Sequence, residues 1–303
     1  ECENMIDQFK KAAKSMMPSL YEALWRQRQR MRGWIYDHMY DGSVITRRGF
    51  RYRLHKCDVT SRNVYVMGLS CPAEISILKS VLSSVNSFID CGAHIGTFAI
   101  PIGQAFSGST LAIEPVESNF NLLQENIRLN QLSSKIEAVQ LAVGDCAGKQ
   151  VIHLSELDRG KHRFGGSEAM SSGQEEVEVV RLDFLVENRP DLAPPYLIKL
   201  DVEGAEYQAL TGFGELLMEP CLIFCEFWPH ALESTGPGVA ALDDLRLSRG
   251  LAAFEVPLHI SCLKPLTSLS ELAARLPDDE SYCDVILTNM TVREIELNRW
   301  LVD

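Results

Sequence analysis

Short apolar runs alternate with amphipathic segments through most of the chain, and this rhythm predicts parallel strands joined by helices. Most of the runs are apolar on both faces, which is typical of strands covered by helices on both sides. The sequence therefore predicts an α/β fold with a mostly parallel sheet. The predicted strands are residues 88–91, 110–113, 136–143, 196–200, 221–227, 252–260 and 283–287.

The front of the chain does not follow this alternation. Residues 4–39 are predicted to be helical in two pieces that break near Pro18, and residues 44–54 are predicted to form a β-hairpin. We therefore divide the chain into a helical and hairpin extension, residues 1–64, and a main domain, residues 65–303.

A second hairpin is predicted inside the main domain. Its strands are residues 151–154 and 177–180, which alternate between polar and apolar side chains. The stretch between them, residues 156–176, is polar and rich in glycine. It serves either as a lid over a site or as an exposed connection.

A glycine-containing turn, Asp90 to Thr97, follows the first predicted strand. Glycines at such a turn let the backbone pass close beneath a cofactor and let the next helix pack tightly. A dinucleotide motif begins with glycine, whereas this turn begins with Asp90, whose carboxylate would repel a pyrophosphate. The carboxylate suits S-adenosylmethionine, which carries a sulfonium and an ammonium group and no phosphate. The predicted cofactor contacts in the turn are Asp90, Gly92, Ala93, His94, Gly96 and Thr97.

A second acid, Glu114, ends the next predicted strand. It lies 24 residues after Asp90 (90 to 114), about the spacing at which an acid accepts both ribose hydroxyls of a cofactor. The pair favours a methyl donor. The alternatives are a nicotinamide fold, or a turn-capping Asp90 with a solvated Glu114. Ala142 and Val143 end the third predicted strand and either contact the adenine or belong to the strand core.

Charged residues also end the next two predicted strands. Lys199 and Asp201 share one strand face about 7 Å apart, and Glu203 follows. Glu226 and His230 follow the neighbouring strand, at the sheet edge where open parallel sheets bind ligands. Asp201 and Glu226 are the leading candidates for a catalytic base, and His230 is the third. Lys199 and Glu203 complete the predicted catalytic group, and Asp201 is also a predicted cofactor contact. A structural pairing of Asp201 with Lys199, or a Mg²⁺ site among the carboxylates, would explain the same residues.

Charge is unevenly distributed along the chain. The formal net charge of −12 argues against a general nucleic-acid binder. Residues 1–56 hold 12 Lys/Arg and 6 Asp/Glu, net +6, which leaves −18 for the remainder. The basic front end is expected to dock on the main domain as a helical cap, or to bind an acidic partner or membrane surface, or to mediate oligomerisation.

The cysteines and the lengths of the apolar runs indicate in which cellular compartment the protein is expected. Nine cysteines stand singly without a C-x-x-C pair, and no apolar run approaches the roughly 18 residues that span a bilayer. The chain also opens without a signal-peptide pattern. These features predict a cytoplasmic protein with reduced thiols and no stable membrane insertion.

Four blocks of the sequence resemble the FkbM-type family of S-adenosylmethionine-dependent methyltransferases. They are residues 89–96, residues 113–119 with Asn126 and Asn130, residues 142–145, and residues 198–206. The resemblance covers roughly residues 65–290. It implies a Rossmann-like class I methyltransferase fold, with a seven-stranded sheet whose last strand is antiparallel. The resemblance also adds Pro115 and Asn119 to the predicted cofactor contacts. This sequence departs from the family at His94, where Asn is usual.

The resemblance implies transfer of a methyl group from S-adenosylmethionine to a hydroxyl of a sugar, polyketide or related natural product. In such a displacement the protein mainly positions donor and acceptor and excludes water. Methylation of a protein, a peptide or another nitrogen is one alternative. A binding module that keeps the cofactor pocket without catalysis is another.

Overall fold

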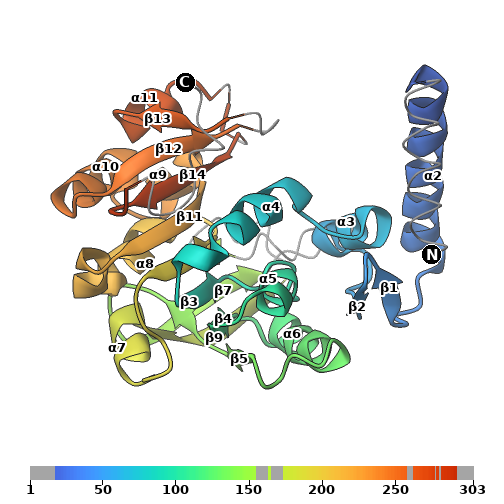
Figure 1. Ribbon diagram of the computed structural model, residues 1–303, viewed down its shortest axis with the longest axis horizontal. Helices are drawn as coiled ribbons and strands as arrows, with labels where there is room; N and C mark the ends of the chain where they lie inside the picture. Colours follow the sequence, from blue (N-terminus) through green and yellow to red (C-terminus); the bar gives the residue numbers. More distant parts are fainter. Residues whose placement is uncertain are drawn as a thin grey trace.

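The computed structural model describes residues 18–154, 163–164, 173–257, 262–276, 278–279 and 281–291 (Figure 1). An eight-stranded sheet lies at its centre, in the order β13-β12-β14-β11-β10-β3-β4-β5. The strands, from edge to edge, are β13 (Lys264–Leu266), β12 (Ala252–Val256), β14 (Cys283–Thr288), β11 (Cys221–Phe227), β10 (Tyr196–Leu200), β3 (Ser87–Cys91), β4 (Ser109–Ile113) and β5 (Ile136–Val139).

Seven of these strands form the predicted sheet. Five of them, β5, β4, β3, β10 and β11, are parallel to one another, and β14 runs antiparallel between β11 and β12. The predicted class I methyltransferase arrangement with an antiparallel last strand is thus confirmed. The eighth strand, β13, pairs with β12 at the edge and was not predicted, because the three residues Lys-Pro-Leu carry no strand pattern.

Helices cover both faces of the sheet because successive strand residues enter opposite cores. Leu222 and Phe224 of β11 lie in one core, and Ile223 and Cys225 lie in the other. On the first face lie α4 (Pro72–Ser80), η1 (Leu82–Ser84), α5 (Ala99–Ala105) and α6 (Glu117–Leu129). On the second lie α7 (Leu182–Glu187), α8 (Glu206–Phe213), η3 (Gly214–Met218), α9 (Pro229–Thr235), α10 (Gly238–Ser248) and α11 (Leu269–Ala273).

The prediction of one strand over residues 136–143 is wrong. β5 ends at Val139, and β6 (Ala142–Val143) leaves the central sheet to pair with β9 (Gly173–Val180). The reason is a separate small core, in which Ala142 packs with side chains of the predicted second hairpin. That hairpin is confirmed as β7 (Gly148–Leu154) paired with β9, and β8 (Arg163–Phe164) completes a four-stranded sheet.

Two other predictions fall partly outside the described residues. β12 ends at Val256, and residues 258–260 of the predicted strand are not described. The same holds for most of the proposed lid, residues 156–176. Of the two predicted front helices, the structure describes the second as α2 (Pro18–Met39), and the first lies outside the described residues.

The described part of the extension packs on the main domain. It consists of α2, β1 (Ile45–Arg47), β2 (Phe50–Tyr52) and α3 (Val59–Met67), and Figure 1 shows these elements together at one side of the sheet. Tyr52 and Leu54 share a hydrophobic core with Ile100 and Leu123 of the main domain. The extension is therefore part of the same folded unit as the sheet.

Asn126 of α6 and Asn130, the C-cap residue of that helix, hold the extension in place. The Asn126 side chain accepts from the backbone N–H of Arg53 at 2.7 Å and donates to the carbonyls of Arg53 and Ile95. Asn130 pairs in the same way with the backbone of Arg51. The side chains thus satisfy backbone groups at the edge of β2 that would otherwise lack partners.

Replacing Asn126 by alanine should lower the free energy of unfolding by about 2 to 3 kcal/mol, because this buried side chain loses three hydrogen bonds. Urea unfolding followed by circular dichroism measures this. Gln124→Ala, an exposed position on the same helix, serves as the control and should change the value by less than about 0.5 kcal/mol. Equal values for the two variants would contradict the docking role.

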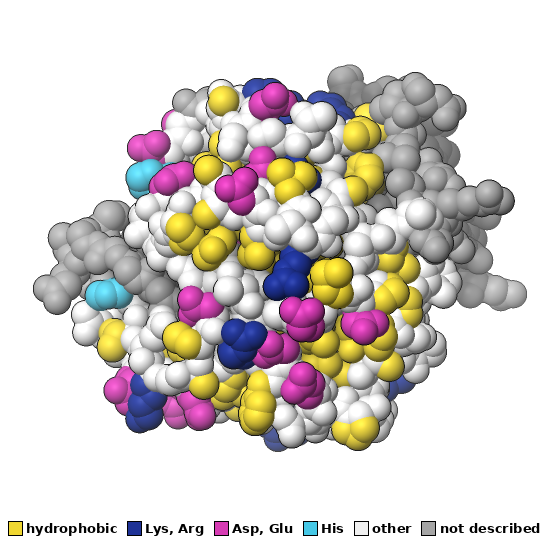
Figure 2. Space-filling model, turned by 90° about the vertical axis from the view of Figure 1, so that its left-hand side faces the viewer, with side chains coloured by type: hydrophobic (Ala, Val, Ile, Leu, Met, Phe, Trp, Pro, Cys, Tyr) yellow, Lys and Arg dark blue, Asp and Glu magenta, His cyan; other side chains and the backbone are white. Residues whose placement is uncertain are grey.

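The surface away from the extension is mainly acidic. Figure 2 shows acidic side chains predominating over basic ones, with apolar side chains scattered between them. This agrees with the negative charge of the main domain. Within the described residues, no single helix is long and apolar enough to cross a membrane. Two consecutive helical segments, Val59–Met67 and Pro72–Ser84, would together be long and apolar enough, but they are bent by 78° relative to each other.

Candidate active site

A cavity of about 380 Å³ opens at the carboxyl ends of β3, β4, β10 and β11. This is the edge at which the sequence predicts a ligand. Of the predicted cofactor contacts, eight line the cavity besides Asp201: Gly92, His94, Thr97, Glu114, Pro115, Asn119, Ala142 and Val143. Ala93, Gly96 and Asp90 are not among the residues that line the cavity.

Glu114 is positioned by the turn after β3. Its carboxylate is only 4 % exposed, and Oε2 accepts from the backbone N–H of His94 at 2.9 Å. Oε1 accepts from the N–H of Val116 and from Asn119 Nδ2, both at 3.1 Å. Burial raises the pKa of Glu114 to about 7, against the effect of these donors. The result is a fixed carboxylate at the cavity wall.

In the glycine turn, Gly92 lies in close contact with the backbone of Asp201. Gly92 has φ of 79°, and a Cβ there would lie 1.8 Å from the backbone oxygen of Asp201. Gly92 therefore makes room for the residue that follows β10, and it also lines the cavity; the expected close approach of a ligand to Gly92 stays a prediction. His94 adopts φ of 51°, which points its N–H at Glu114.

Asp90 does not reach the cavity. Its side chain is fully buried, and Oδ1 lies 3.7 Å from Lys199 Nζ. Burial raises the pKa of Asp90 to about 6, while the nearby Lys199 ammonium opposes that rise. The structure therefore gives Asp90 a protein cation as its neighbour, and its direct contact with a methyl donor stays a prediction.

Lys199 links the ends of β10 and β3. Its Nζ lies 2.9 Å from Asp201 Oδ2, donates to the carbonyl of Gly92 at 3.0 Å and stands 5.1 Å from the centre of the Phe98 ring. Burial lowers the pKa of Lys199, but Asp201 and Asp90 raise it more, so that it stays above its ordinary value. Lys199 is consequently a charged structural cation, and the expected pairing with Asp201 is present.

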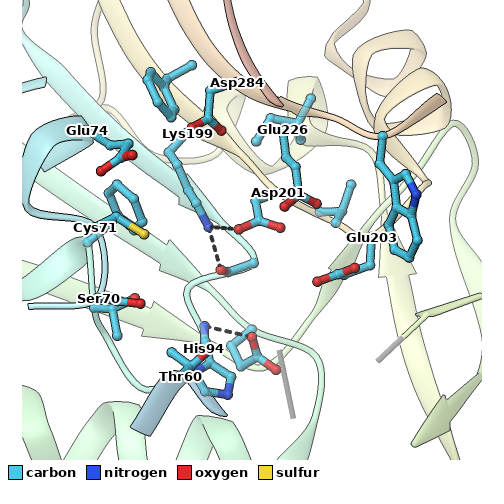
Figure 3. Close-up of a pocket in the computed structure, with 18 of the residues that line it drawn as sticks. Thr60, Ser70, Cys71, Glu74, His94, Lys199, Asp201, Glu203, Glu226 and Asp284 are labelled. Carbon is cyan, nitrogen blue, oxygen red and sulfur yellow. Dashed lines mark hydrogen bonds and ion pairs between the residues drawn. The ribbon is translucent and has the colours of Figure 1, made fainter. Parts of the chain in front are cut away.

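Asp201, Glu203 and Glu226 converge beside Lys199 (Figure 3). One carboxylate oxygen from each lies within 4.8 Å of the others. Burial raises the pKa of Glu226 well above its ordinary value, and the charges of Asp201 and Glu203 add to the rise. Oxygens so placed suit Mg²⁺, but acidic groups commonly lie this close without an ion, so no metal is assigned.

His230 is separated from these acids. It lies on α9 with its side chain 52 % exposed, and Nδ1 is 3.8 Å from Oδ1 of Asp279. It is not among the residues that line the cavity. The structure thus favours Asp201 and Glu226 over His230 as candidates for the base.

Part of the cavity wall is formed by residues that the sequence did not predict. Thr60 of α3 and Glu74 of α4 line the cavity, and Asp284 of β14 lines it opposite Glu226. Burial raises the pKa of Asp284 to about 8, and the charge of Glu74 adds to the rise. A signal for Asp284 was available, because an antiparallel strand begins at the edge where its parallel neighbours end. The pattern of α3 and α4 gives no comparable signal.

The profile of the methyltransferase FkbM domain matches residues 90–246, which are 157 of the 303 residues. The chain belongs to the FkbM methyltransferase family. The matched FkbM region begins at Asp90 and includes Glu114, Lys199, Asp201 and Glu226. It leaves out the extension and Asp284, which complete the cavity.

Individual relatives of this FkbM chain match it over part of its length. Methyltransferase sdnD of Sordaria araneosa is 30 % identical, over 43 % of this chain and 61 % of that protein. Methyltransferase 1 of Beauveria bassiana is 27 % identical, over 43 % and 59 %. The chain thus spans about three fifths of the length of these curated relatives. The crystal structure of Methyltransferase FkbM from Methylobacillus flagellatus has a TM-score of 0.39 and 16 % identity, covering 78 % of this chain and 56 % of that chain.

Proposed function

We propose that the protein transfers the methyl group of S-adenosylmethionine to a hydroxyl of a sugar or natural product. The observation that carries the proposal is the buried Glu114 carboxylate, fixed at the tip of β4 and open to the cavity. Membership of the FkbM family supports the reaction class. The proposal of a small-molecule or glycan acceptor is supported by the carboxylates that line the cavity.

The residues present fit the methyl donor. Glu114 would accept the ribose hydroxyls, and Leu141, Ala142 and Val143 form an apolar strip of the wall that suits an adenine ring. The donor, when bound, supplies an electrophilic methyl group on a sulfonium. The chain's own part is to hold the donor, orient the acceptor and exclude water.

The acceptor side of the cavity is rich in carboxylates. Glu74, Glu203, Glu226 and Asp284 line it around Lys199, whose ammonium is engaged by Asp201 and Asp90 (Figure 3). The oxygens of these carboxyl groups accept hydrogen bonds. A ligand with many hydroxyl donors matches this wall. Glu226 would remove the proton of the reacting hydroxyl, since Asp201 is held in its ion pair with Lys199.

The same excess of carboxylates favours one alternative acceptor, a cationic amine. Glu74, Glu203, Glu226 and Asp284 all line the cavity, and an ammonium group of a ligand would offset the negative charge of these acids. Methyl transfer from labelled S-adenosylmethionine to fractions of a cell extract distinguishes the two. Label in saccharide or polyketide fractions supports the hydroxyl acceptor, and label in polypeptide or amine fractions contradicts it.

Calorimetric titration with S-adenosylmethionine and with NAD tests the cofactor. The wild type should bind the methyl donor and not NAD. Glu114→Gln should weaken donor binding by about 10- to 100-fold, because hydrogen bonds to a charged acceptor contribute about 1.5 to 3 kcal/mol. Glu117→Gln, an exposed acid on α6, is the control and should bind as the wild type does. Binding of NAD in place of the methyl donor would contradict the proposal.

A further inference from the structure

We propose that His55, in the extension, is a positioning residue for the ribose-binding carboxylate of Glu114. This rests on the proposed function, which assigns Glu114 to the ribose of the methyl donor. The two side chains are joined through Asn119, which lies between them. The extension would thereby complete the cofactor site as well as pack against the sheet.

The side-chain amide of Asn119 forms the central link. Its Oδ1 lies 2.8 Å from His55 Nε2, and its Nδ2 donates to Glu114 Oε1 at 3.1 Å. An amide oxygen can only accept, so His55 Nε2 carries the proton of this contact. The hydrogen bond therefore decides which end of the amide faces Glu114. A reversed amide would turn its oxygen toward the carboxylate.

His55 is itself held by two helices of the extension. Its backbone carbonyl accepts from the hydroxyl of Tyr36 at 2.6 Å, and its backbone N–H donates to Ser61 Oγ at 3.2 Å. Tyr36 belongs to α2 and is 3 % exposed, and Ser61 belongs to α3. The imidazole position therefore depends on how these helices pack.

The contacts from His55 through Asn119 affect how well the Glu114 carboxylate can accept hydrogen bonds from a ligand. Three donors hold the carboxylate, and two of them, the N–H groups of His94 and Val116, belong to the backbone near it. The third donor is the side-chain amide of Asn119, whose orientation is set by His55 of the extension. Hydrogen bonds to the ionised form favour that form, which is the one that accepts from both ribose hydroxyls. A misdirected Asn119 would weaken ribose binding specifically.

The test is calorimetric titration with S-adenosylhomocysteine, the product of the donor. His55→Leu should weaken binding about tenfold, and His55→Gln, which keeps a donor on a side chain of similar reach, should restore most of the affinity. His38→Leu is the matched control, because His38 is an exposed histidine of α2 whose Nδ1 lies 2.8 Å from the carbonyl of Trp34. It should bind as the wild type does.

Titration with the 2′,3′-dideoxy analogue separates positioning from structural damage. His55→Leu should bind this analogue as well as the wild type does, because the analogue lacks the hydroxyls that Glu114 receives. If His55→Leu fails to fold, Tyr36→Phe should show the same selective loss at about threefold. Unchanged binding of S-adenosylhomocysteine, or equal loss for both ligands, overturns the inference. Failure of the wild type to bind S-adenosylhomocysteine overturns the proposed function itself.

Discussion

Glu226→Gln should lower kcat by on the order of 10²- to 10⁴-fold and leave the affinity for the methyl donor unchanged. Glutamine has nearly the same shape as glutamate but cannot take a proton from an acceptor hydroxyl. Glu226 ends β11, on the acceptor side of the cavity and away from Glu114, which explains why donor binding should persist. Steady-state methyl transfer from a labelled donor measures kcat, and calorimetry measures donor affinity.

Glu219→Gln is the matched control for this variant. Glu219 is an exposed acid just before the opposite end of β11, so it shares the strand but not the cavity. Its kcat should equal that of the wild type. If kcat of Glu226→Gln falls by less than about threefold, another group removes the proton from the acceptor hydroxyl.

The pH dependence of the wild type follows from the same residue. Glu226 acts as a base only after it has lost its proton, and burial with the charges of Asp201 and Glu203 raises its pKa well above the ordinary value. The rate should therefore rise with pH, about tenfold per unit below that pKa. Glu226→Gln should lose this limb of the profile. A wild-type rate that is flat or falls with pH would contradict the assignment.

The strand ends explain why much of the site could be predicted from sequence. Glu114, Asp201 and Glu226 each follow an apolar run, and parallel strands carry the residues after such runs to one edge. The antiparallel last strand was implied by the family resemblance, whereas the pairing of Lys199 with Asp201 follows from the period of one strand. Local pattern was sufficient for this pairing because both residues belong to the same strand end.

Other features depend on contacts between distant segments. The burial of Asp90 follows from Lys199, 109 residues later (90 to 199), and Gly92 is required by the backbone of Asp201. Asn126 and Asn130 form part of the sequence resemblance, but only the structure shows that they hold β2. His55 likewise reaches the site through Asn119. No periodicity within one segment carries such information.

Lys199→Met should lower the free energy of unfolding by roughly 3 to 5 kcal/mol near pH 8, because it leaves the fully buried Asp90 carboxylate without its cation. Methionine fills a similar volume, so the loss is mainly electrostatic. Lys149→Met is the matched control, since Lys149 pairs with Glu176 at 2.7 Å but is 70 % exposed. That pair should contribute about 1 kcal/mol or less. Urea unfolding measures both variants.

The loss in Lys199→Met should depend on pH in a definite direction. In the wild type the pKa of folded Asp90 is about 6, above its ordinary value of 3.8, and removal of the ammonium raises it further. A carboxyl whose folded pKa is raised binds its proton more tightly when folded, so stability falls as pH rises through that pKa. The deficit relative to wild type should accordingly be smaller at about pH 5 than at about pH 8. Adding Asp90→Asn, which cannot ionise, should recover part of the stability and remove this pH dependence. A deficit that grows toward low pH would show that Lys199 stabilises the fold through some group other than Asp90.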